Sequence, residues 1–174
     1  MSKIAVIYKS TYGATKKYAE WISEELGADL IERDSAKANM LIDYDIIMYS
    51  GGIYASSISG SDLVSKNACK HLIVFTVGLT NPETMDYTDI MHRAFPNQNI
   101  QPQKVFHLRG AIDYGKLGFL HRNLMKMLNK AVEKKAESEM NEVEKVIKDT
   151  YGKQVDYINR ESIRPIIAYI QGIA

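Results

Sequence analysis

Five short apolar runs alternate with helical patterns along the first two thirds of this chain. The runs cover residues 4–8, 29–33, 45–50, 71–77 and 104–108. Residues 15–26 place Tyr18, Ile22 and Leu26 at four-residue spacing, which is typical of a helix that packs on a sheet. Further helical patterns cover residues 37–41, 61–67 and 87–94. This alternation predicts an α/β fold, with a parallel sheet covered by helices on both faces.

A hydroxyl-rich turn joins the first predicted strand to the first predicted helix. Its residues are Ser10, Thr11, Tyr12, Gly13, Ala14 and Thr15. A turn that opens a helix presents unpaired amides and the positive end of the helix dipole, so it predicts an anion site, best filled by a phosphate monoester. Gly13 permits a positive φ or a close approach to a ligand. The alternative is an N-capped helix without a ligand, because Ser and Thr favour such positions.

The spacing of this turn excludes two common phosphate sites. It contains neither Gly-x-x-x-x-Gly-Lys-Ser/Thr nor Gly-x-Gly-x-x-Gly. It resembles the phosphate loop of flavodoxins, a Ser/Thr-x-Thr-Gly-x-Thr turn around the phosphate of FMN, and differs at the third position, where Tyr12 replaces Thr. The resemblance implies FMN as cofactor and a flavodoxin-like three-layer α/β/α fold, whose five-stranded parallel sheet has the order 2-1-3-4-5.

In that strand order, ligands bind beyond the carboxyl ends of the first and third strands. The segment after the third strand contains Gly51, Gly52, Ile53, Tyr54 and Ala55. In flavodoxin-like proteins this loop lies against the isoalloxazine ring, so the resemblance implies that Ile53 and Tyr54 contact it; the alternative is an exposed loop tyrosine. The loop after the fourth strand, expected on the other side of the ring, contains Thr76, Val77, Gly78, Leu79 and Thr80.

The last third of the chain contains two candidates for the helix that completes the fold, residues 117–135 and 161–171. The second has the better pattern, with Asn159 as N-cap and isoleucines at positions 163, 166, 167 and 170. A strand-like run covers residues 154–158. We therefore expect a largely helical insertion, about residues 110–152, that interrupts strand five of a single domain spanning residues 1–174, as in long-chain flavodoxins.

The insertion carries concentrated positive charge. Residues 104–135 contain eight Lys and Arg against two Asp and Glu. Arg109, Gly110 and Tyr114, followed by a long insertion, resemble the menaquinone-dependent protoporphyrinogen oxidase family, which implies a porphyrinogen as electron donor and a quinone as acceptor. Candidate contacts to such a substrate are Lys116, Arg122 and Lys126 for carboxylates, and Leu117, Leu120 and Leu124 for an apolar face. The alternatives are a flavodoxin-type electron carrier, a cofactor-free module, and a solvated helical hairpin.

Composition limits the remaining function classes. The net charge is +1, which gives no argument for nucleic acid and differs from strongly acidic shuttle flavodoxins. The single cysteine, Cys69, excludes an internal disulfide, and the four dispersed histidines form no zinc signature. We see no signal peptide and no apolar stretch near the roughly 20 residues that span a membrane. A cytoplasmic protein is expected, with a small-molecule or protein redox partner such as a quinone, and at most peripheral membrane contact.

Overall fold

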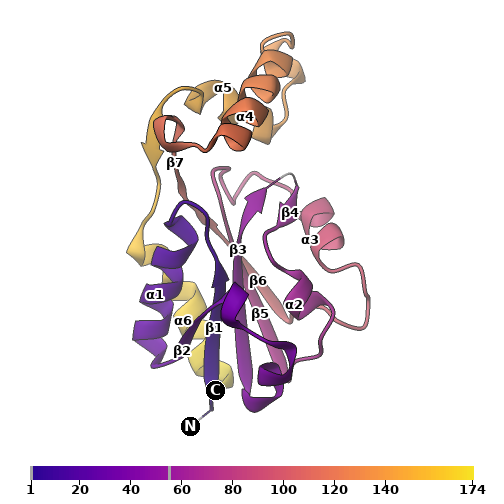
Figure 1. Cartoon of the computed structure of the whole chain (residues 1–174), viewed down its shortest axis with the longest axis vertical. Coiled ribbons are helices and arrows are strands. Elements are labelled where there is room, and N and C mark those ends of the chain that lie inside the picture. Colours follow the sequence, from indigo (N-terminus) through magenta and orange to yellow (C-terminus); the bar gives the residue numbers. More distant parts are fainter. Residues whose placement is uncertain (1, 55) are drawn as a thin grey trace. The chain divides into compact units, whose positions relative to one another are not determined.

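A computed structural model of the chain describes residues 2–54 and 56–174 (Figure 1). Its contacts divide it into two compact units. The core unit comprises Met1–Gly78, Tyr87–Leu108 and Asn159–Ala174, and the insertion unit comprises Leu79–Asp86 and Arg109–Ile158. The insertion unit contains all of the expected insertion, residues 110–152. That residues 1–174 form a single domain stays a prediction.

A parallel sheet lies at the centre of the core unit. Its strands are β1 (Ile4–Lys9), β2 (Asp29–Glu32), β3 (Ile46–Tyr54), β5 (His71–Gly78) and β6 (Lys104–Arg109). They lie in the order β2-β1-β3-β5-β6, which confirms the predicted order 2-1-3-4-5. β1 pairs in parallel with β2 and β3, and β3 pairs in parallel with β5. Lys9 and Gly51 are partners in this register, so the carboxyl ends of β1 and β3 lie side by side.

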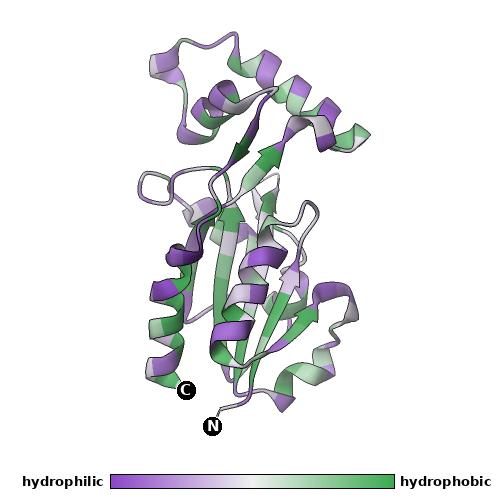
Figure 2. Ribbon diagram, turned by 90° about the vertical axis from the view of Figure 1, so that its left-hand side faces the viewer, coloured by the Kyte–Doolittle hydropathy of each residue, from purple (hydrophilic) through white to green (hydrophobic). Residues whose placement is uncertain are grey.

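Helices cover both faces of this sheet. Figure 1 shows α1 (Ala14–Leu26) and α6 (Arg164–Ile173) on one face, and α2 (Asp62–Ser65) and α3 (Thr88–Ala94) on the other. Short 3₁₀ turns cover Arg33–Ser35, Ala38–Asp43, Tyr114–Lys116, Glu137–Glu139 and Arg160–Ile163. The three layers form because continuous apolar strands need cover on both faces (Figure 2). The predicted flavodoxin-like α/β fold is confirmed.

The final helix packs as its sequence pattern predicted. Ile163, Ile166 and Ile170 of the isoleucine stripe are buried, and Ile167 is half-buried. The Asn159 side chain accepts a hydrogen bond from the amide of Glu161, at the turn that leads into α6. The amide of Asn159 donates to the Tyr18 hydroxyl of α1, at 3.0 Å. The C-terminal segment therefore belongs to the same core as the first helix.

The insertion unit has a small core of its own. Its helices are α4 (Phe119–Val132) and α5 (Glu142–Thr150), and Val132, Met140 and Ile147 are buried together. The predicted strand at residues 154–158 forms as β8 (Gln154–Asp156), which pairs antiparallel with β7 (Ala111–Asp113) in a separate two-stranded sheet. Within the described ranges, no helix is long and apolar enough to cross a membrane.

Candidate functional site

The hydroxyl-rich turn begins α1 through its backbone. Gly13 is the N-cap of α1 and has a left-handed conformation, with φ of 96°. Among the described residues, none would crowd a Cβ at this position within 4 Å, so the conformation and not the space requires glycine. The Ser10 hydroxyl oxygen accepts a hydrogen bond from the Gly13 amide at 3.0 Å and closes the turn. In the part of the chain that the structure describes, no side chain caps α1. The Ser10 hydroxyl therefore has a structural role in the turn, and the alternative of a helix start without a ligand stays open.

The groups at this turn suit a phosphate. The first hydrogen bond of α1 runs from the Lys17 amide to the Gly13 carbonyl. The amides of residues 14–16 lie in the first turn and therefore precede the repeating backbone hydrogen bonds of the helix. That turn contains no acidic residue. Thr11, Tyr12 and Gly13 are exposed and Thr15 is buried. Amide and hydroxyl donors without a competing carboxylate fit the phosphate of FMN.

The segment after the third strand differs from the predicted loop. Gly51, Gly52, Ile53 and Tyr54 form the end of β3, and β4 (Ser57–Ile58) pairs antiparallel with it. The prediction of a loop was wrong because a hairpin supplies backbone partners: Ile53 lies opposite Ile58, and Tyr54 lies opposite Ser57. Ala55, also predicted to contact the cofactor, lies outside the described residues.

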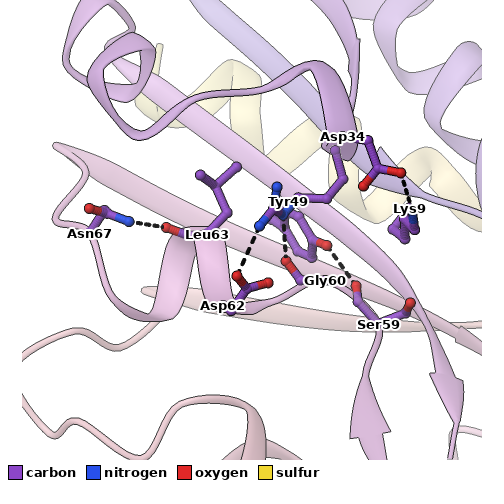
Figure 3. Close-up of polar contacts among 9 residues, drawn as sticks. Lys9, Asp34, Tyr49, Ser59, Gly60, Asp62, Leu63 and Asn67 are labelled. Carbon is purple, nitrogen blue, oxygen red and sulfur yellow. Dashed lines mark hydrogen bonds and ion pairs between the residues drawn. The ribbon is translucent and has the colours of Figure 1, made fainter.

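Gly51 is required by this hairpin. A Cβ at Gly51 would lie 2.4 Å from the Ser59 carbonyl oxygen, which no side chain tolerates. The same oxygen accepts a hydrogen bond from the Tyr49 hydroxyl at 2.6 Å (Figure 3). The following turn is held by Arg33, whose side chain donates to the Gly60 carbonyl and pairs with Asp62 at 2.9 Å. Glycine at this position therefore lets the backbone of the hairpin approach β3 closely.

Tyr54 connects the end of β3 to the hydroxyl-rich turn. Its side chain forms a hydrogen bond with the Thr11 side chain, and 38% of its surface is exposed. Burial raises the pKa of the Tyr54 hydroxyl, and the Thr11 hydrogen bond partly offsets this. The structure therefore brings together two of the three predicted cofactor segments. Whether Tyr54 contacts a flavin ring stays a prediction.

The third predicted segment is divided between the two units. Thr76, Val77 and Gly78 end β5 in the core unit, where Thr76 is the register partner of Gly51. Leu79 and Thr80 belong to the insertion unit, in which the Arg109 guanidinium donates to the Leu79 carbonyl at 3.0 Å. The structure thus places Thr76, Val77 and Gly78 beside the glycines of β3.

His107 is a half-buried polar group that the sequence analysis did not assign to the site. Its Nδ1 lies 2.6 Å from the Thr76 hydroxyl oxygen, and its ring stacks on Tyr87 with the centroids 3.5 Å apart. The Thr76 hydroxyl is therefore already bonded within the protein. Burial lowers the pKa of His107 to about 4, which keeps the ring neutral near pH 7. Its position inside a predicted strand was the only signal in the sequence.

The three basic residues predicted for a substrate have different environments in the insertion unit. Lys116 pairs with Asp113 at 3.5 Å. The Arg122 guanidinium donates to the Leu117 carbonyl at 3.0 Å and so holds the turn before α4. Lys126 is exposed on α4. Leu117 is only 4% exposed, so the prediction that it faces a ligand was wrong, because it packs inside the unit instead. Their role in substrate binding stays a prediction.

The described residues contain no group of three or more His, Cys, Asp or Glu side chains that could hold a metal ion. Cys69 is a free thiol whose pKa burial raises to about 11, so it is protonated near pH 7.

Comparison with known proteins identifies related chains. An uncharacterized protein of Methanocaldococcus jannaschii is 30% identical over 94 residues, which cover 51% of this chain and 63% of that protein. The chain thus spans less than two thirds of that relative.

Solved structures with a similar fold include a putative flavoprotein from Bacteroides eggerthii, with 15% identity, a TM-score of 0.49, and coverage of 62% of this chain and 89% of that chain. A flavoprotein in complex with FMN from Lactobacillus acidophilus has 14% identity and a TM-score of 0.45. The match covers 62% of this chain and 93% of that chain. A family model for the flavodoxin domain matches residues 5–139. The chain therefore belongs to the flavodoxin domain family.

Proposed function

We propose that this chain binds FMN by its phosphate at the turn of residues 10–15 and acts as a redox flavoprotein. The observation that carries the proposal is the start of α1. It opens at a left-handed Gly13 without an acidic residue in its first turn, and Thr11 of the same turn is bonded to Tyr54 at the end of β3. Family membership supports the same assignment.

The residues of the turn have separate roles in this proposal. Amides of the first turn of α1 and the Thr11 hydroxyl hold the phosphate, while Ser10 keeps the turn closed. Tyr54 packs its ring against the flavin, and the neutral His107 holds the end of β5 through Thr76. FMN supplies the electron transfer, and the chain supplies binding and orientation.

A titration that compares FMN with riboflavin tests the phosphate assignment. Flavin fluorescence should be quenched by the protein at much lower FMN than riboflavin concentrations, because only FMN carries the phosphate. Gly13→Ala and Gly13→Asp impose similar backbone strain, but Asp adds a negative charge, so Gly13→Asp should weaken FMN further and leave riboflavin near the Gly13→Ala value. Gly172→Asp, in α6, is the control for an added carboxylate in a position without steric conflict. Equal affinities for FMN and riboflavin would contradict the proposal.

Oxidation of a porphyrinogen with a quinone as acceptor is a second candidate. The observation that favours it is the composition of α4, on which Lys126 is exposed together with Leu120 and Leu124. A flavodoxin-type electron carrier needs no such surface. Steady-state turnover with protoporphyrinogen and a menaquinone analogue separates the two, since a carrier gives reduction of bound flavin without catalytic turnover.

A further inference from the structure

Helix α4 presents large apolar side chains to solvent. Phe119 is 84% exposed, Leu120 77%, Met127 61% and Leu124 37%. The side of α4 that packs inside the insertion unit is formed by other residues, among them Met125, Leu128 and Val132. Leu120, Leu124 and Met127 follow at i, i+4 and i+7 and form a separate row. Together with Phe119, at the first position of the helix, we call them the α4 apolar row.

A row of cations runs beside the α4 apolar row. Arg122, Lys126 and Lys130 follow one another at four-residue spacing, which places them on one side of the helix. From Phe119 to Val132, α4 contains no Asp or Glu. All three cations are exposed. The exposed half of α4 thus combines apolar groups with uncompensated positive charge on its own helix.

We propose that α4 binds an anionic membrane surface. A helix with a cationic row beside large apolar side chains lies in the plane of the interface, with its apolar groups among the acyl chains and its cations at the lipid phosphates. With 14 residues, α4 is shorter than the roughly 20 residues that a membrane span requires, so it lies on the bilayer. This inference does not depend on FMN binding.

The charge of α4 argues against a second copy of the chain as the partner that covers the α4 apolar row. Two α4 helices that met through their apolar rows would bring two cationic rows close together, and the helix offers no carboxylate to compensate them. An anionic lipid surface removes this repulsion, because it offers negative charge along the whole length of the row.

Flotation of the full chain with lipid vesicles tests the proposal. Vesicles that contain phosphatidylglycerol and phosphatidylcholine in about equal amounts should bind the protein, and pure phosphatidylcholine should bind it much more weakly. Raising the salt to about 0.5 M should reduce binding to the anionic vesicles, because screening weakens the attraction of the cations. Equal binding to both vesicle types, or none to either, would overturn the proposal.

Two matched pairs of variants assign the binding to α4. Leu120→Ser/Met127→Ser should lower vesicle binding at least about tenfold. Ile42→Ser, which removes a 71% exposed side chain from the core unit, should not change it. Lys126→Gln/Lys130→Gln should lower binding to anionic vesicles about tenfold, whereas Lys37→Gln/Lys66→Gln, which removes equal charge from exposed sites elsewhere, should lower it less than about threefold.

Thermal unfolding identifies any variant that fails to fold. Because the substituted side chains are exposed, the unfolding temperature should stay unchanged. A concentration-dependent dimer that Leu120→Ser/Met127→Ser abolishes, in a protein that binds no vesicle, would assign the α4 apolar row to a second copy. Binding to anionic vesicles that is unchanged in Leu120→Ser/Met127→Ser would also overturn the proposal.

Discussion

The core unit and the insertion unit bury their apolar side chains in different ways. In the core unit, strands β1, β3 and β5 are continuous buried runs between two layers of helices. In the insertion unit, three buried side chains, Val132, Met140 and Ile147, form the apolar cluster between two helices. Ion pairs such as Lys135–Glu144 and Lys148–Glu137 also join residues of this unit. Water screens such pairs, so each contributes little to stability.

This difference indicates a division of roles. A large core fixes the geometry of the turn at residues 10–15, which a cofactor site needs because its donors must hold their positions. A small core opens locally at lower free energy. We therefore expect cofactor binding to depend on the core unit and surface binding on the insertion unit.

Removing one buried side chain from each unit should give the largest difference between the two units, measured as the loss in free energy of unfolding. Ile166→Ala, at a fully buried site of the core unit, should lower the free energy of unfolding by about 3–4 kcal/mol through lost burial and a cavity. Ile147→Ala should cost about 2 kcal/mol, because its small cluster can partly collapse, and should speed hydrogen exchange in α4 and α5 while sparing the sheet. Urea denaturation and hydrogen exchange measure both. If Ile147→Ala sped hydrogen exchange equally in both units, the distinction between a large and a small core would be contradicted.

Acid should weaken the core unit through His107. Its pKa is about 4 in the folded chain and about 6.5 when unfolded. The unfolded chain binds the proton first, so this contribution to stability is present above about pH 6.5 and is lost as the pH falls toward 4. The full slope for one proton is about 1.4 kcal/mol per pH unit, and we expect about half because the ring is partly exposed. A His107→Gln variant should lose this slope in urea denaturation at stepwise pH; an unchanged slope would contradict the assignment.

The proposed ring contact has a smaller effect. Tyr54→Ala should weaken FMN by about tenfold, since stacking contributes roughly 0.5–1.5 kcal/mol beyond area burial. Tyr54→Phe retains the ring but loses the hydrogen bond to Thr11, and so separates stacking from the link to the turn. Fluorescence titration gives both affinities. A crystal structure with bound FMN and the Tyr54 ring turned away from it would reject the contact.

Surface ion pairs of the insertion unit give the smallest effect. Lys148→Gln removes the partner of Glu137, whose pKa the lysine lowers, at a fully solvated site. The unfolding free energy should not change measurably, because water screens such pairs. A clear loss of stability in urea denaturation would mean that charge and not the apolar cluster holds this unit together.

The order of the strands could be predicted because it follows from local patterns. Continuous apolar runs indicate buried strands, and the isoleucines of α6 repeat with the helical period. The left-handed Gly13 was likewise indicated by a glycine at a strand–helix turn. Each of these features depends on neighbours within a few residues.

Features that depend on distant partners were missed. The hairpin after β3 fixes Gly51 through the Ser59 carbonyl, a contact that no local pattern reveals. The bond between Thr76 and His107 joins two strands that are far apart in the sequence. Likewise, Leu117 belongs by periodicity to the helical stripe, but the turn held by Arg122 buries it.

Shortening the insertion tests the division of roles most directly. The Tyr157 amide donates to the Gly110 carbonyl at 3.0 Å, so residues 111–156 can be replaced by a short Gly-Ser linker without stretching the chain. Loop closure changes only slowly with length, so the core unit should fold. FMN affinity should stay within about threefold of the full chain, while vesicle flotation should be abolished. A folded, shortened protein that no longer binds FMN, or one that still binds anionic vesicles, would contradict the account.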